Sequence, residues 1–360
     1  MANEIGQIRP EPVEQIEFGT LATTAIQRSA RGILFIVVED ATHAPGLLRL
    51  KSVADLKEED WDEKTYDILM LAYQKYVPNK IIIRVLGQDE DYSAALEEAA
   101  DIQMSWLACP MASEEDDIKV VAWVKEQFGT TAIKKAVQYV SAYADNSDHV
   151  AIIEFDCPGV LESRLGTFTA QEYTVAIAAA EAGCPVNKSL DGAVMPDLKS
   201  VPFVKAKLGK FTLVFDGEDV KVRYALNSKT TFDSTWKKDT RKIKVVSGMC
   251  FIVEDIRKSF KQWRGNYINS SDNKKNFCST VTKTYFPEMA PNVLSADYPN
   301  AIWIDFEAQK RYIITEVGEE KLEEMTDTEI LNYPTGDDVY IIGDVRFADT
   351  MANLLMYILM

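Results

Sequence analysis

The chain has 360 residues, 47% of them hydrophobic and 10% aromatic, which is typical of a globular protein long enough for two domains. Its net charge of −17 weighs against general nucleic-acid binding, and no run approaches the roughly 20 apolar residues of a membrane-spanning helix. The first twenty residues carry Glu4, Glu11, Glu14 and Glu17 against a single Arg9, the reverse of a secretory leader, so folding in the cytoplasm is expected.

The first half of the chain predicts an arm followed by an α/β domain. Residues 1–20 show no helical period and hold Pro10 and Pro12, so they are expected to form an extended N-terminal arm. Residues 21–200 then alternate between strand and helix patterns, as a mostly parallel sheet requires. Strands are expected at Ile33–Val38, Lys80–Leu86, Trp106–Cys109, Ala136–Val140 and Val150–Phe155. Helices are expected at Trp61–Tyr76, at Tyr92–Ile102, after Ser113 and at Ala170–Ala182.

Two of these helices carry local signals at their ends. Ser113 precedes four acidic residues, Glu114–Asp117, which complement the dipole of a helix start and need no metal ion. The helix Ala170–Ala182 is rich in small residues and stops at Gly183, with Pro185 close behind. Small residues on this helix predict a close approach to a neighbouring element.

After residue 200 the pattern changes and predicts an α+β domain over residues 201–344. A hairpin is expected where Asp216–Asp219 separates Phe211–Phe215 from Val220–Leu226. Two helices should follow, a long one with Ile256, Phe260 and Trp263 on one face and a second at about Asn276–Met289. Strands are expected at Ile302–Phe306, Arg311–Val317 and Val339–Ile342. Residues 345–360 are expected to form a C-terminal arm whose end, Leu354–Met360, is apolar and uncharged.

The charge is unevenly distributed along the chain. Residues 221–283 carry 15 lysines and arginines against 5 acidic residues, whereas the stretches before 200 and after 283 are acidic. Neutralisation of acidic surface within the protein or its assembly is the favoured explanation; an acidic protein partner and a nucleic-acid stripe are the alternatives. The expected charge contacts are Lys237, Lys238, Arg241, Lys242, Arg257 and Lys258.

Residues that could support catalysis are sparse. The sequence has no Gly-x-x-x-x-Gly-Lys or Gly-x-Gly-x-x-Gly motif, and His43 and His149 belong to no ligand-spaced cluster. The five cysteines are 27 or more residues apart, which indicates reduced, buried thiols. Ser234 and Lys237 match Ser-x-x-Lys, and Ser271 begins a Ser-Asp-Asn, but the third element of the penicillin-recognising enzymes, Lys-Thr-Gly, is missing. No catalytic, cofactor-binding or metal-binding residues are therefore expected.

From about Tyr173 to its end, the chain resembles the sheath proteins of contractile phage-type tails, including the small sheaths of prophage elements and phage-tail-like bacteriocins. The resemblance rests on an ordered set of segments that no single motif would identify. These segments are Tyr173–Leu190 with its Pro-x-Asn-x-Ser-Leu end, the hairpin Phe211–Tyr224, Leu226–Phe232 with its Asn-x-x-Thr-Thr turn, Arg241–Val246, Glu254–Arg257, Phe260, Tyr267-Ile268 and the closing Asp349–Ile358. Departures occur after Pro10, after Ile268 and at Ala352-Asn353.

The resemblance implies a structural subunit that forms hexameric rings, stacked into a sheath around a tail tube, and that contracts to drive the tube through a target envelope. It implies exchange of terminal arms between subunits, contacts with tube, baseplate and terminator proteins, and release in a virion or tail-like particle. The assembly residues expected on the two arms are Ile5, Ile8, Val13, Ile16, Phe18, Val345, Phe347, Leu354, Leu355, Tyr357 and Ile358. The alternative is an α/β enzyme at the strand ends of the 30–160 sheet, with Glu39 and Asp40 as candidate carboxylates.

Overall fold

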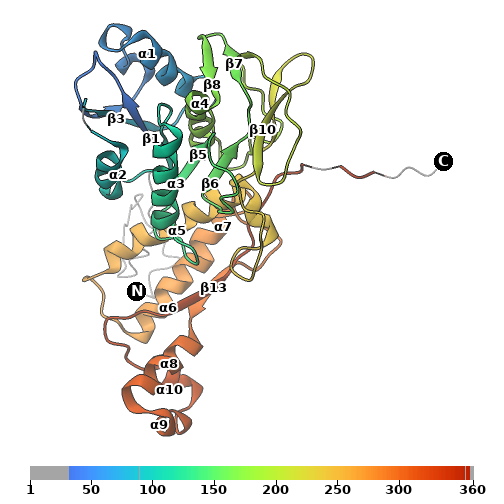
Figure 1. Cartoon of the computed structure of the whole chain (residues 1–360). Helices are drawn as coiled ribbons and strands as arrows, with labels where there is room; N and C mark the ends of the chain where they lie inside the picture. Colours follow the sequence, from blue (N-terminus) through green and yellow to red (C-terminus); the bar gives the residue numbers. More distant parts are fainter. Residues whose placement is uncertain (1–31, 89, 353, 357–360) are drawn as a thin grey trace, which may run out of the picture.

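The computed structural model describes residues 32–88, 90–352 and 354–356. Figure 1 shows a large α/β part, a middle part dominated by long helices, and a cluster of short helices at the far end. The C-terminal segment leaves the body of the molecule as an extended chain (Figure 1).

An eight-stranded sheet forms the centre of the α/β part, in the order β11-β10-β6-β5-β4-β1-β3-β2. The six central strands from β10 to β3 run parallel, while β2 and β11 pair antiparallel at the two ends. The strands are β1 (Ile33–Glu39), β2 (Gly46–Leu50), β3 (Lys80–Leu86), β4 (Trp106–Ala108), β5 (Gln138–Ser141), β6 (Ile152–Phe155), β10 (Lys210–Phe215) and β11 (Val220–Tyr224). Most residues of the central strands are buried because helices cover both faces of a parallel sheet.

Helices cover both faces of this sheet and bury a hydrophobic core on each. Helices α1 (Glu63–Met70) and α4 (Ala170–Gly183) pack on one face. Helices α2 (Tyr92–Asp101) and α3 (Glu114–Phe128) pack on the other face, together with the first turns of α5 (Ile243–Trp263). Short 3-10 turns occupy Val53–Asp55, Glu58–Asp60, Leu71–Tyr73 and Lys238–Arg241. The fold class expected from the sequence is confirmed.

Helix α4 makes the close approach that its small residues predict. A Cβ atom at Gly183 would lie 2.6 Å from backbone atoms of Tyr76 and Val77, so only glycine fits there. At the start of α4, Thr169 and Glu172 form a reciprocal capping box. Ser113 caps α3 by accepting a hydrogen bond from the Asp116 amide, also as expected.

A three-stranded sheet lies beside the large one in the order β8-β7-β9. Its strands are β7 (Val160–Ser163), β8 (Thr167–Thr169) and β9 (Leu198–Ser200), which the sequence patterns did not predict. The hairpin β10–β11 appears where expected, but it extends the large sheet. The α/β sheet therefore continues past residue 200, where the sequence places a domain boundary.

The second part is built around α5, which runs out of the α/β part (Figure 1). Helix α6 (Ser271–Thr280), a π-helical turn (Val281–Tyr285) and α7 (Phe286–Met289) pack against α5 around a third hydrophobic cluster. The helix expected at 276–289 begins earlier because Ser270 caps it at the Asn273 amide. Strands β12 (Ala301–Ile304) and β13 (Ile341–Asp344) pair antiparallel beside these helices.

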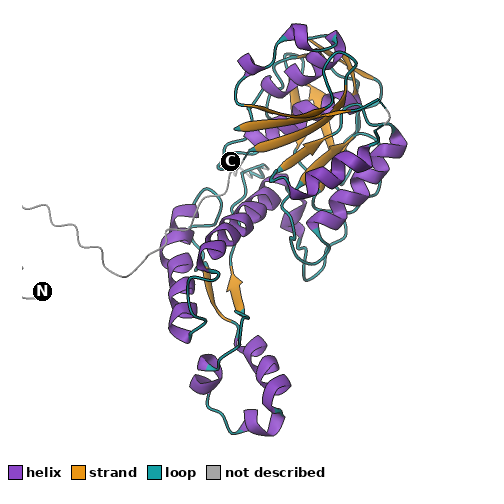
Figure 2. Ribbon diagram, turned by 90° about the vertical axis from the view of Figure 1, so that its left-hand side faces the viewer, coloured by secondary structure: helices purple, strands orange, loops and turns teal. Residues whose placement is uncertain are grey.

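Three short helices are inserted between β12 and β13 and form the far end of the molecule (Figure 2). They are α8 (Phe306–Val317), α9 (Glu319–Glu323) and α10 (Asp327–Asn332). The strand predicted at Arg311–Val317 is wrong, because this segment is the second half of α8. Asp305 caps α8 at the Ala308 amide, and Gln309 and Ile313, four residues apart, form its buried face.

Candidate assembly surfaces

The chain end begins as part of the subunit's own core. Val345 and Phe347 pack against the hydrophobic cluster of α5 to α7, and Phe347 forms an antiparallel bridge with Leu294. The Ala348 amide donates a 2.9 Å hydrogen bond to the Val293 carbonyl. These contacts correct the expectation that the arm begins at residue 345. Val345 and Phe347 stabilise their own subunit and do not project from it.

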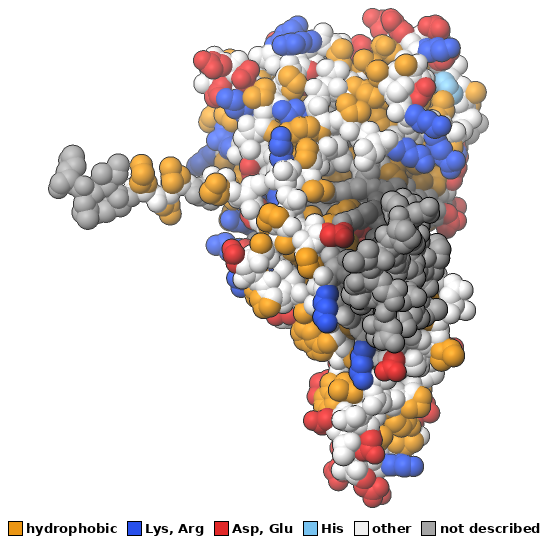
Figure 3. Space-filling model, turned by 180° about the vertical axis from the view of Figure 1, so that it is seen from behind, with side chains coloured by type: hydrophobic (Ala, Val, Ile, Leu, Met, Phe, Trp, Pro, Cys, Tyr) orange, Lys and Arg blue, Asp and Glu red, His pale blue; other side chains and the backbone are white. Residues whose placement is uncertain are grey.

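Beyond Thr350 the described chain projects from the body of the subunit. Met351, Leu354 and Leu355 expose 104%, 83% and 98% of their reference surface. Figure 3 shows the C-terminal segment projecting from the body with hydrophobic side chains along it. Apolar side chains exposed to this degree mark a surface that another molecule covers. Tyr357 and Ile358 lie outside the described residues, as do Ile5, Ile8, Val13, Ile16 and Phe18 of the N-terminal arm.

The sheet β12–β13 offers one protected edge and one open edge. On the β12 side, the Thr282 hydroxyl accepts from the Ile302 amide at 3.0 Å and donates to the Ile302 carbonyl at 3.3 Å. On the other side, β13 pairs with no further strand of the described chain. An open edge presents unpaired amides and carbonyls to which an extended segment can add as a new strand.

A groove runs alongside β13 and continues to the end of α5; we call it the α5–β13 groove. It consists of two adjoining hollows of about 640 and 580 Å³ that share Phe260, Arg264, Phe277 and Val339. Its remaining lining comes from α5, α6, β12 and β13, from the loop that follows α5 and from the loop that precedes β13: Ile256, Arg257, Lys261, Trp263, Gly265, Tyr267, Ile268, Asn269, Asn273, Lys274, Ile302, Gly336, Asp337, Ile341, Ile342 and Gly343. The floor is apolar, and Arg257, Lys261 and Arg264 supply positive charge.

The six expected charge contacts have different surroundings. The Lys242 side chain is only 5% exposed and its ammonium pairs with Asp191 at 2.8 Å, so the expectation that it contacts another molecule is corrected. Arg257 donates to the Ile133 and Lys134 carbonyls, and Arg241 lies over the Tyr224 ring. Lys237, Lys238 and Lys258 are exposed at the surface.

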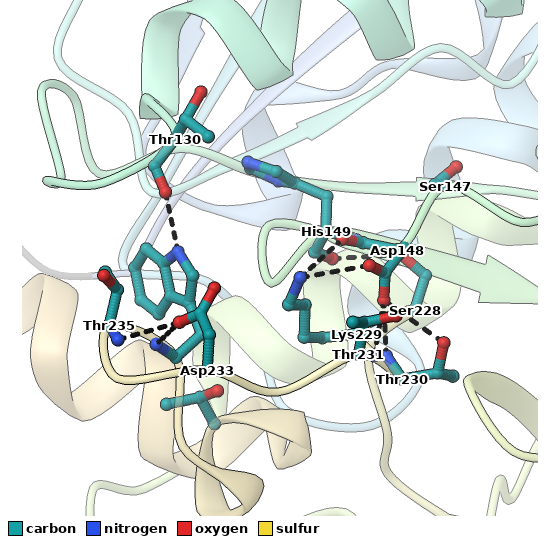
Figure 4. A network of polar contacts seen from close by, with 12 residues as sticks. Thr130, Ser147, Asp148, His149, Ser228, Lys229, Thr230, Thr231, Asp233 and Thr235 are labelled. Carbon is teal, nitrogen blue, oxygen red and sulfur yellow. Dashed lines mark hydrogen bonds and ion pairs between the residues drawn. The ribbon is translucent and has the colours of Figure 1, made fainter.

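The Asn-x-x-Thr-Thr turn that contributes to the resemblance is held by one carboxylate (Figure 4). Asp148 accepts hydrogen bonds from the amides of Thr230 and Thr231 at 2.7 and 2.8 Å, and pairs with Lys229 at 3.1 Å. Burial raises the pKa of Asp148, but these donors outweigh it and hold the pKa well below its usual value. The neighbouring His149 is partly buried against Phe128, and this burial lowers its pKa to about 4.

Of the two carboxylates considered for an enzyme, Glu39 and Asp40, Asp40 holds local structure together. Asp40 accepts from the amides of Thr42, His43 and Asp62, which closes its own loop at the end of β1. Ser234 lies in a turn organised by Asp233, and the Ser271 hydroxyl bonds to Asn332. No group of three or more potential metal ligands occurs among the described residues. Within the same part of the chain, no helix is long and apolar enough to cross a membrane.

Comparison with known proteins finds similarity to tail sheath proteins. No family model matches the chain. A curated relative, the tail sheath protein of Clostridium phage phiCD119, is 26% identical over 359 residues, covering 94% of this chain and 96% of the relative. The resemblance to contractile-tail sheath proteins that the sequence indicates is confirmed by this relative and by solved structures of the same fold.

The solved structures share the fold at low sequence identity. The sheath tail protein of Desulfitobacterium hafniense matches with a TM-score of 0.65 and 12% identity, over 84% of this chain and 94% of that one. The helical sheath of the anti-feeding prophage in its contracted state matches with a TM-score of 0.67 and 14% identity, over 98% of this chain and 99% of that one. These matches show that the chain has the fold of tail sheath proteins.

Proposed function

We propose that the protein is the subunit of a contractile tail sheath and polymerises as stacked hexameric rings around a tail tube. The observation that carries this proposal is the pairing, in one subunit, of a projecting apolar tail with an open sheet edge. Contraction of the polymer would drive the tube through a target envelope. Assembly takes place in the bacterial cytoplasm, and the sheath then becomes part of a virion or a released tail-like particle.

The tail beyond Thr350 adds to the β12–β13 sheet of a neighbouring subunit. Extended residues can pair with the open edge of β13, and alternate side chains can enter the apolar part of the α5–β13 groove. Burying one large apolar side chain contributes about 1.5–3 kcal/mol. Leu354, Leu355, Tyr357 and Ile358 together would contribute up to about 10 kcal/mol, an amount comparable to the net stability of a domain.

Charge contacts add selectivity to these apolar contacts. The exposed Lys237, Lys238 and Lys258 face acidic surface on neighbouring subunits or on the tube. The far-end helices, with 11 acidic residues against 3 basic ones between Asp305 and Asp338, supply such a surface on the subunit itself. Baseplate and terminator proteins bind the ends of the polymer. The anti-feeding prophage baseplate structure, which matches with a TM-score of 0.65, supports the baseplate contact.

Electron microscopy of two truncated chains tests the proposal. Removal of residues 351–360 should leave soluble subunits that unfold cooperatively but no longer form rings or tubes, because it spares every contact of Phe347 and Ala348. Removal of residues 345–360 should also destabilise the subunit, since it removes Val345 and Phe347 from the core. Tubes from the shorter deletion equal to those of the full chain would contradict the proposed strand exchange.

A further inference from the structure

In the part of the α5–β13 groove at the end of α5, which we call its upper part, Trp263 and Phe277 form a buried aromatic floor, and the adjoining Tyr267 is 37% exposed. Trp263 stacks on Tyr267 with 4.3 Å between ring centroids, and Phe277 meets Trp263 edge-on at 5.3 Å. Ile268, at the rim, is 82% exposed, and Phe260 is 38% exposed. This surface is continuous with the apolar strip along β13 and large enough to take an extended peptide.

Two polar groups of the groove lack the partners that buried groups normally have. Lys274 is 4% exposed, and its ammonium donates to Thr335 at 2.8 Å and Gln309 at 3.3 Å, but it pairs with no carboxylate of the described chain. Burial accordingly lowers the pKa of Lys274. The buried Oδ1 of Asn269 has no donor among the same residues. A buried ammonium held only by neutral acceptors, beside an unused carbonyl, favours an occupant that brings carboxylates and backbone amides.

Charge distinguishes between the two arms as occupants of this part of the groove. The C-terminal tail beyond Thr350 has no charged side chain, so it brings no counter-charge for Lys261, Arg264 and Lys274, and Asp337 is the one carboxylate in the described lining of this hollow. Residues 4–18 combine the apolar Ile5, Ile8, Val13, Ile16 and Phe18 with Glu4, Glu11, Glu14 and Glu17. This composition complements an apolar groove with a basic rim, so the N-terminal segment fits it better than the tail does.

The same chain can deliver this segment to its own groove. Gly32, where the described chain begins, lines a small hollow together with Phe251 and Glu254 of α5. At 1.5 Å per helical residue, Phe251 and Phe260 are only about 14 Å apart along α5. The residues between Phe18 and Gly32 can span roughly 40 Å when extended. The tether also gives a local concentration on the order of millimolar, which favours the chain's own groove in dilute subunits.

We propose that residues 4–18 occupy the upper part of the α5–β13 groove of their own subunit before assembly, with glutamates paired to Lys261, Arg264 and Lys274. The segment thereby covers the exposed Phe260, Tyr267 and Ile268 and keeps unassembled subunits soluble. On polymerisation it moves to the upper part of the same groove in a neighbour, beside the C-terminal tail along β13. This exchange conserves the contacts of the segment, so the protein concentration determines which of the two states is populated. The exchange rests on the proposed sheath function, whereas occupation within one subunit does not.

Cross-linking of dilute subunits tests the occupation. In a Cys157→Ser background, where the remaining native cysteines are buried, Val13→Cys is combined with Ile268→Cys and treated with a short bis-maleimide. A cross-link within single chains should form at least five-fold more readily than in the control that combines Val13→Cys with Lys119→Cys on α3. An equimolar mixture of the two single variants should give cross-linked dimers only after polymerisation. Yields equal to the control, or dimers from dilute subunits, would refute the proposal.

Charge reversal identifies the contacts that hold the segment. Lys261→Glu combined with Arg264→Glu should lower the cross-link within single chains several-fold, and adding Glu14→Lys and Glu17→Lys should restore it. A yield unchanged by the first pair would overturn the ionic pairing. The two proposals fail separately: cross-linked single chains that never polymerise would contradict the sheath function, and tubes without that cross-link in dilute subunits would contradict the inference.

Discussion

Two alanine substitutions in the last sixteen residues should have opposite consequences. Phe347 is half-buried: a Cβ atom at Gly248 would lie 3.3 Å from its ring, and its backbone bridges Leu294. Truncating a fully buried phenylalanine costs about 3–5 kcal/mol, so Phe347→Ala should cost the subunit about 2 kcal/mol. Leu355 is 98% exposed, so Leu355→Ala should change subunit stability by less than about 0.5 kcal/mol.

In the polymer, Leu355→Ala should be the more damaging of the two substitutions. If Leu355 is buried in a neighbour, losing it removes about 1.5–3 kcal/mol per contact, which weakens association about 10- to 100-fold. Thermal unfolding of dilute subunits measures the first effect, and sedimentation of polymers across protein concentrations measures the second. The reasoning is refuted if Leu355→Ala lowers the melting temperature as much as Phe347→Ala does, or if it leaves the critical concentration for polymerisation unchanged.

Three further predictions concern stability and charge. Burial lowers the pKa of His149 from 6.5 to about 4, so between these pH values the unfolded chain binds the proton more readily than the folded chain does. The free energy of unfolding should therefore fall by up to about 3 kcal/mol as the pH drops from 6.5 to 4. Denaturant titrations of His149→Asn should show a weaker pH dependence. In the same assay, Gly183→Ala should lower the free energy of unfolding by about 1–3 kcal/mol because its Cβ would collide with the Tyr76 backbone. Gly87→Ala should be nearly neutral, since the nearest atom to its Cβ would be a Glu90 carboxylate oxygen at 3.5 Å. Lys237→Glu with Lys238→Glu should weaken polymerisation more at low salt than at high salt, as light scattering would show; equal weakening at both would indicate packing in place of charge.

The α/β part could be predicted because its signals are local. Lys80–Leu86 is a strand with the bounds that the sequence suggests, and Ser113 and Thr169 cap helices through contacts within one turn. Strands β7 to β9 have three or four residues each, too few for a period of two to stand out, and they depend on partners as distant as Ser163 and Leu198. Their formation is decided by tertiary contacts.

The sequence predicts a strand at Arg311–Val317 because β-branched and aromatic residues favour strands locally. The segment is helical because tertiary contacts stabilise α8. Gln309 donates to the Ile330 carbonyl at 2.7 Å and accepts from Lys274, which holds α8 against α10 and α6. Lys274 lies within the basic stretch 221–283, and its sequence position gives no sign of burial. The fold shows that it is 4% exposed and pairs with no carboxylate of the described residues.

The assembly surfaces, too, could be predicted from the sequence only in part. An uncharged, apolar chain end can be predicted from composition to need a covering surface, because water solvates it poorly. The residue at which the arm leaves its own subunit cannot be predicted in this way, since Phe347 and Leu355 have the same apolar character. The difference comes from Leu294, more than fifty residues away in the sequence, which pairs with Phe347 and holds it on its own subunit. Lys242 is a parallel case, because its charge is satisfied by Asp191 and not by a neighbour. Composition therefore indicates which segments need partners, and the fold decides which of them find those partners within their own subunit.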